Sequence, residues 1–194
     1  MKKDHSPSDL ILDYSSRLQA LLEASDWSSV NLLAQDMLRC WREKRQVFFC
    51  GNGGSAGNAI HLANDFLYGI AKKTGAGLRV QALSANSAVI TCLANDIGYE
   101  SIFSEQLAVQ AQAGDLLVAL SGSGNSPNIL RVIEQAKAMN VKSYAILGFT
   151  GGKCKDLVDV PIHFSVNDMQ IAEDMQLIVG HMMMQYLCNT SKIQ

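Results

Sequence analysis

The chain has 194 residues, of which 48% are hydrophobic and 18% charged, a balance typical of a globular domain with a sizeable core. The formal net charge of −2 and the interspersed acidic and basic residues exclude a broad basic surface, so we expect neither a nucleic-acid partner nor a membrane partner. The five cysteines are widely spaced without a CxxC pair, and the N-terminal lysines precede no apolar run, so we expect a cytoplasmic protein with reduced thiols.

The first 44 residues are predicted to be helical. Apolar residues recur at helical spacing in two stripes, one on either side of a break at 25–27. We therefore expect a helical hairpin over 1–44, ahead of an α/β core over 45–194, within a single domain over 1–194.

From residue 45 onward, short apolar runs alternate with segments long enough for helices. The predicted strands are 46–50, 79–83, 115–120, 142–147 and 160–164, and the main predicted helices are 55–70, 100–112, 126–140 and 171–189. This alternation predicts a parallel sheet covered by helices on both faces. The last helix is apolar around much of its circumference, from which we expect a homo-oligomer.

Two loops rich in glycine and serine follow predicted strands, at the edge where parallel sheets bind ligands. The first, GNGGSAG at 51–57, fits a tight turn as well as a binding site, and it lacks the spacing of a dinucleotide fingerprint or a P-loop. The second, SGSGNSPN at 121–128, presents three hydroxyls before Pro127, which suits the first turn of a helix. Free N–H groups and hydroxyls there favour an anion. Because neither loop has a lysine or arginine, we predict a site for a phosphate monoester.

Four titratable residues are candidates for chemistry. His61 and Asp65 are four apart on a predicted helix and project from one face. Glu173 and His181 are eight apart on the last helix, a rise of about 12 Å, so they reach one centre only by leaning toward each other. The set fits proton transfer between adjacent carbons of a sugar, or the ligands of zinc or a similar metal. The sequence leaves both uses open beside plain surface or core roles.

Three segments carry a resemblance to a known family: GNGGSAGNAIHLANDF at 51–66, LANDIGYESIFSEQL at 93–107 and SGSGNSPNIL at 121–130. They closely resemble the sedoheptulose 7-phosphate isomerases (phosphoheptose isomerases), which are sugar isomerase (SIS) domain proteins, and the resemblance covers nearly the whole chain. It implies a homotetramer of flavodoxin-like three-layer α/β sandwiches, each with a five-stranded parallel sheet. It also implies conversion of sedoheptulose 7-phosphate into D-glycero-D-manno-heptose 7-phosphate, through an enediol, for bacterial heptoses of lipopolysaccharide or other surface polysaccharides.

The resemblance also implies roles for individual residues. Those implied to bind the phosphorylated sugar are Asn52, Gly53, Gly54, Ser55, Asp65, Asn95, Asp96, Ser121, Gly122, Ser123, Ser126 and Glu173. Those implied to bind a metal, with one zinc per site, are His61, Asp65, Glu173 and His181. Asp65 and His181 are implied to be catalytic.

The sequence departs from the family pattern at three places near this centre. Asp65 replaces a glutamate, Glu173–Asp174 replaces a Gln–Glu pair, and Gln176 replaces a common histidine. Asp65 withdraws its carboxylate by about one bond length, which matters for a proton transfer. Every position keeps a group that binds metal or moves a proton, which favours an active enzyme. Two alternatives stay open: a non-catalytic SIS tetramer that binds the bacterial replication initiator protein, and an isomerase or epimerase of another phosphosugar.

Overall fold

One parallel sheet of five strands, in the order β2-β1-β3-β4-β5, organises the computed structural model, which describes residues 6–190. The strands are β1 (Gln46–Gly51), β2 (Arg79–Ala82), β3 (Leu116–Ser121), β4 (Lys142–Leu147) and β5 (Val160–His163). All five predicted strands are confirmed. The central strand β3 is buried along its whole length, as expected for an apolar strand covered on both faces of a parallel sheet.

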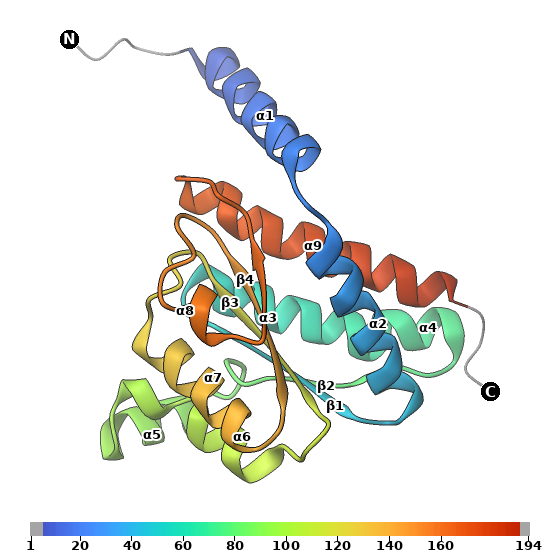
Figure 1. Cartoon of the computed structure of the whole chain (residues 1–194), viewed down its shortest axis with the longest axis vertical. Coiled ribbons are helices and arrows are strands. Elements are labelled where there is room, and N and C mark those ends of the chain that lie inside the picture. The colour runs from blue at the N-terminus through green and yellow to red at the C-terminus, as the bar shows by residue number, and fades with distance from the viewer. Residues whose placement is uncertain (1–5, 191–194) are drawn as a thin grey trace.

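Helices cover both faces of the sheet, so the predicted three-layer arrangement is confirmed (Figure 1). One face carries α2 (Ser28–Arg42), α3 (Gly54–Asn64), α4 (Ile70–Thr74) and α9 (Met169–Asn189), and a π-helical turn, η1 (Asp65–Gly69), joins α3 to α4. The other face carries α5 (Ser87–Asp96), η2 (Tyr99–Ser101), α6 (Ser104–Gln110), α7 (Pro127–Ala138) and α8 (Cys154–Leu157). The strands alternate between the two cores: Val47 and Phe49 face the first, and Phe48 and Cys50 the second.

The predicted N-terminal hairpin is wrong in its arrangement, although both of its helices form. The first helix, α1 (Pro7–Ala24), points away from the body and does not fold back along α2 (Figure 1). The physical reason is that the apolar stripe of α2 already packs against the sheet and α9. No residue of α1 is buried among the described residues, and Leu10, Ile11 and Leu12 are exposed.

The C-terminal half of α1 is nevertheless attached to the start of α9. The Tyr14 hydroxyl donates to Asp174 (2.5 Å), and the Arg17 guanidinium pairs with Asp168 (2.6 Å). No helix within residues 6–190 combines the length and hydropathy that crossing a bilayer requires.

Candidate active site

A pocket of about 270 Å³ opens at the carboxyl ends of β1 and β3. In the strand order 2-1-3-4-5, the chain reverses its direction of winding between these two strands, which is where doubly wound folds bind ligands. The lining residues are Asn52, Gly53, Gly54, Ser55, Leu120, Ser121, Gly122, Ser123, Ser126, Met169 and Glu173. The two loops singled out in the sequence therefore meet in one place, with Glu173 of α9 beside them.

The glycines of the first loop allow a close approach between α3 and α9. Gly53, just before α3, has a φ of 55°, a conformation that glycine adopts without strain. A Cβ at Gly54 would collide with the carboxylate of Glu173. Any larger residue at position 54 would thus displace the acidic side chain from the pocket.

The second loop offers its hydroxyls at the start of α7. Ser126 is the residue before the helix, yet its side chain makes no capping hydrogen bond among the described residues. Ser121 Oγ accepts a hydrogen bond from the Gly124 N–H (3.1 Å), which leaves the Ser121 proton available as a donor. Gly124 has a φ of 67° and lies against the backbone of Gly151. The loop is shaped to present hydroxyls and N–H groups, and no cationic side chain lines the pocket in the described part of the chain.

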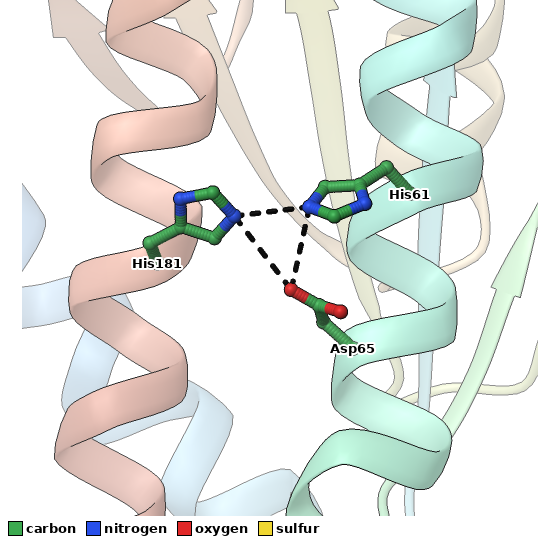
Figure 2. A group of neighbouring side chains, drawn as sticks. All are labelled: His61, Asp65 and His181. Carbon is green, nitrogen blue, oxygen red and sulfur yellow. Dashed lines mark hydrogen bonds and ion pairs between the residues drawn. The ribbon is translucent and has the colours of Figure 1, made fainter.

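A second group of side chains lies further along the same two helices. His61 and Asp65 come from α3 and the start of η1, and His181 comes from α9 (Figure 2). The two histidine Nε2 atoms lie 3.0 Å apart, and Asp65 Oδ2 lies 3.4 Å from His61 Nε2 and 3.6 Å from His181 Nε2. The carboxylate side chain is 18% exposed, and the imidazoles are 47% and 46% exposed. The cluster is therefore open to a ligand.

Local packing explains why these side chains converge. Gly180 is buried on α9, and a Cβ there would collide with the side chain of Leu62 on α3. This close contact brings His61 and His181, each next in sequence to one of the contacting residues, opposite each other across the two helices. The widened π turn begins at Asp65, and such turns inside α-helices are frequent at functional sites.

The donor atoms of this cluster fit a metal ion. Ligand atoms around a tetrahedral zinc, at bond lengths of 2.0–2.1 Å, are separated by roughly 3.3 Å, close to the three distances found here. Two imidazole nitrogens and one carboxylate oxygen are also a donor set that zinc accepts in enzymes. In the contact between the two rings one nitrogen donates and the other accepts, with the roles set by the tautomers. His61, Asp65 and His181 therefore form a possible metal-binding arrangement.

Glu173 is not part of this cluster. It lies two turns before His181 on α9 and lines the pocket. Three of the four predicted metal ligands therefore come together in the described structure, while the carboxylate of the fourth lies against Gly54 in the pocket. The separation follows from the helical rise between positions 173 and 181.

Asn95 and Asp96 lie apart from the pocket, on the last turn of the exposed helix α5. The Asn95 amide donates to the Asp96 carboxylate (2.8 Å), and the Cys92 thiol lies 3.5 Å from the same carboxylate. Among residues 6–190, neither of these predicted substrate residues lines the pocket or hydrogen-bonds to a residue that does.

Sequence reasoning missed an amide pair beside the pocket. Asn52 and Asn128 exchange two hydrogen bonds, of 2.9 and 2.8 Å, and the Tyr99 hydroxyl donates to Asn52 Oδ1 (3.1 Å). Asn128 is buried and thereby fixes the orientation of the Asn52 amide. The only signal in the sequence was an asparagine directly after Pro127 in a helix start, where a buried side chain needs a polar partner.

Comparisons with known proteins agree with this geometry. The SIS domain family matches residues 12–148. A phosphoheptose isomerase of Akkermansia muciniphila is 36% identical over 173 residues, which are 89% of this chain and 89% of that protein. A phosphoheptose isomerase of Nitratiruptor sp. is 37% identical over 142 residues, which are 73% of this chain and 75% of that protein. A solved phosphoheptose isomerase structure from Francisella tularensis superposes with a TM-score of 0.87 at 26% identity, covering 94% of this chain and 98% of that one.

Proposed function

Because the chain belongs to the phosphoheptose isomerase family of SIS-domain proteins, we propose that it is an aldose–ketose isomerase acting on sedoheptulose 7-phosphate. Its product is D-glycero-D-manno-heptose 7-phosphate, a precursor for bacterial heptoses in surface polysaccharides. The observation that carries this proposal is that α3 and α9 contribute residues both to the serine pocket and to the His61–Asp65–His181 cluster.

The spacing of the two features supports a long sugar phosphate. From Ser55 to His61 the rise along α3 is roughly 9 Å, and from Glu173 to His181 along α9 it is roughly 12 Å. Sedoheptulose 7-phosphate carries its phosphate on C7, at the opposite end from the reacting C1 and C2. With the phosphate among the serines, the carbonyl end extends toward the cluster.

The serine loop binds the phosphate in this proposal. Ser121, Ser123 and Ser126 supply hydroxyl donors, and the first N–H groups of α7 add their dipole. Gly122 brings the backbone close, and Asn52, Gly53, Gly54, Ser55 and Glu173 contact the sugar. Asn95 and Asp96 reach substrate only with a movement of α5 or in an assembly of several chains.

The isomerisation needs one proton moved between carbons and another between oxygens. We assign the carbon proton to Asp65: its carboxylate removes a proton from C1, an enediol forms as the C2 oxygen gains a proton, and the proton then returns to C2 as O1–H is lost. His181 transfers the proton at oxygen. Among the described residues, Asp65 contacts the histidines through Oδ2, which leaves Oδ1 for this exchange.

We also propose that His61, Asp65 and His181 hold one zinc ion per site. A bound zinc would polarise the carbonyl and the enediol oxygens as a Lewis acid. Glu173, which the resemblance implies as a further ligand, serves in this account as a substrate contact at the pocket.

A homotetramer is the assembly that we propose. Exposed apolar side chains gather on α1 and on the helices around the cluster: Leu10, Ile11, Leu12, Ile60, Leu67, Tyr68, Met182 and Tyr186. Association would bury them and shield the half-exposed imidazoles from water. Light scattering coupled to size-exclusion chromatography should give four times the mass of the 21.1 kDa chain. A monomer at micromolar concentration would contradict the proposal.

A single domain over 1–194 and a cytoplasmic location complete the proposal. The packing of α2 against the sheet and α9 supports one domain, because the core continues across residue 44.

The reaction itself is tested by turnover. Purified protein is incubated with sedoheptulose 7-phosphate, with and without added zinc, and the products are followed by proton NMR. We expect the heptose 7-phosphate to appear and other ketose phosphates to react more slowly. A preference for another phosphosugar would replace the substrate assignment. Absence of turnover together with capture of the replication initiator protein would favour the non-catalytic alternative, against which the assembled cluster argues.

A further inference from the structure

Gln176, in the middle of α9, has a buried side-chain amide that hydrogen-bonds to Ser55, a residue that lines the pocket. Gln176 is fully buried, and its side chain lies between Ser55 and Asn58 of α3. A buried amide without partners would be costly, and this one has a partner at each end: its nitrogen lies 3.0 Å from Ser55 Oγ, and its oxygen lies 3.0 Å from Asn58 Nδ2.

The direction of these hydrogen bonds is fixed by a backbone carbonyl. The Glu173 carbonyl oxygen accepts a hydrogen bond from the Asn58 side chain at 3.0 Å. A carbonyl cannot donate, so the atom of Asn58 that faces it must be Nδ2. The same Nδ2 faces Gln176, whose facing atom must therefore be the acceptor Oε1. The Gln176 Nε2 group is then left facing Ser55, to which it donates.

These hydrogen bonds determine whether the Ser55 hydroxyl acts as a donor or as an acceptor toward a ligand. Ser55 Oγ accepts from Gln176, so the lone pair on that side is occupied while the hydroxyl proton stays free. Ser55 lines the pocket and makes no other side-chain hydrogen bond among the described residues. In a pocket without lysine or arginine, an anion depends on hydroxyl and N–H donors that already point the right way.

We propose that Gln176 is a positioning residue that holds the Ser55 hydroxyl as a hydrogen-bond donor toward the phosphorylated substrate. Gln176 does not touch the ligand and acts only through Ser55. The inference rests on the proposed function in one respect, namely that the pocket receives a phosphate.

The first test measures binding of inorganic phosphate to the full-length protein by calorimetry. Gln176→Met removes the donor but keeps the size of the side chain, so it should weaken phosphate binding about three- to tenfold, the effect of one hydrogen bond. Ser55→Ala should weaken binding by a similar factor. The double variant should bind like Ser55→Ala alone, because Gln176 has no route to the ligand without that hydroxyl. Gln135→Met, on the far end of α7, is the matched control and should bind like wild type.

A second pair of variants covers the case in which Gln176→Met does not fold. Gln176→Glu has the same shape but accepts only, so Ser55 would turn its proton inward and phosphate binding should weaken more than in Gln176→Met. Gln176→His restores one donor and one acceptor and should recover binding to near the wild-type level. In the isomerase assay, each weakened variant should show a raised KM with kcat close to wild type.

Three results would overturn the inference: phosphate binding unchanged in Gln176→Met and Gln176→Glu, losses that simply add in the double variant, or no phosphate binding by wild type. Failure of the proposed function looks different. In that case the wild-type protein binds phosphate with the predicted dependence on Gln176 and Ser55 but turns over no sedoheptulose 7-phosphate.

Discussion

His61 and His181 are 120 positions apart in the chain, yet their Nε2 atoms lie 3.0 Å from each other across the α3–α9 contact (Figure 2). Their rings are nearly perpendicular, at 87°, and the two Nε2 atoms are directed at each other between the helices (Figure 2). Asp65 completes this arrangement from one side. The geometry places acceptor atoms together without a proton donor for each of them, which is the condition under which a bound cation or a shared proton stabilises a site.

Loss of either proposed catalytic group should abolish most of the turnover. We predict that His181→Ala and Asp65→Asn each lower kcat by about 10²- to 10⁴-fold, the usual contribution of general acid–base groups. Steady-state kinetics with sedoheptulose 7-phosphate measures the effect, and circular dichroism verifies the fold. His163→Gln is the control and should keep its activity. His163 lies at the end of β5, where its ring contacts the carbonyl of Phe149. Near-normal kcat in His181→Ala would remove that residue from the mechanism.

Metal binding should depend on the same cluster. We predict that zinc titrated into metal-free protein binds at one site per chain, and that His61→Ala weakens this binding by at least tenfold, because a ligand is removed. Isothermal titration calorimetry measures the affinity. Asp96→Ala removes an exposed carboxylate outside the cluster and should bind zinc as wild type does. Equal affinities in His61→Ala and wild type would place the metal elsewhere.

The serine loop should affect binding more than chemistry. We predict that Ser123→Ala and Ser126→Ala each raise KM about tenfold while kcat stays near wild type, because each removes one hydrogen bond to a charged phosphate. Ser87→Ala, on the exposed start of α5, should leave both constants unchanged. If the two loop variants lowered kcat at unchanged KM, the phosphate would have to lie outside this loop.

The close contact of α3 with α9 should be sensitive to a single methyl group. Gly180→Ala drives a Cβ into Leu62, and we predict a loss of about 1–3 kcal/mol in the free energy of unfolding, together with weaker zinc binding. Gly57→Ala is the matched control: nothing lies within 4 Å of a Cβ at that helical position, so the change should be neutral or stabilising by up to about 1 kcal/mol. Urea unfolding measures both. An unchanged free energy of unfolding in Gly180→Ala would show that α3 and α9 move apart without cost.

The attachment of α1 should be lost in strong alkali. Burial and the hydrogen bond to Asp174 raise the pKa of Tyr14 from 10.0 to about 12. The raised value means that the folded protein keeps this proton when the unfolded chain has lost it, so the stabilisation is present below pH 10 and disappears as the pH approaches 12. We predict that the free energy of unfolding falls less steeply over that range in Tyr14→Phe than in wild type. Identical slopes would contradict the assignment.

The sheet and the two loops were predictable from the sequence because their signals are local. Buried parallel strands read as continuous apolar runs, and the glycine and serine segments follow them directly. The helix α5 was missed because it is short and has no fully buried residue, although Ile90, Leu93 and Ala94 lie at helical spacing and pack against the second core.

Relationships across the chain were harder to predict. The hairpin prediction failed because the apolar periodicity of α1 does not tell which surface covers it. Whether Glu173 and His181 belong to one site or to two depends on how α9 packs against α3, which the sequence does not show. The role of Gln176 depends on the backbone carbonyl oxygen of Glu173, which no pattern of side chains reveals.

The most direct test of the central claim follows hydrogen exchange at the reacting carbons. The protein is incubated with sedoheptulose 7-phosphate in deuterated water, and deuterium at C1 of the ketose and C2 of the heptose is measured by NMR and mass spectrometry. We predict that wild-type protein introduces deuterium at these carbons and that Asp65→Asn does not. Conversion of the ketose with no solvent hydrogen at either carbon in wild type, or unchanged exchange in Asp65→Asn, would contradict proton transfer by this site.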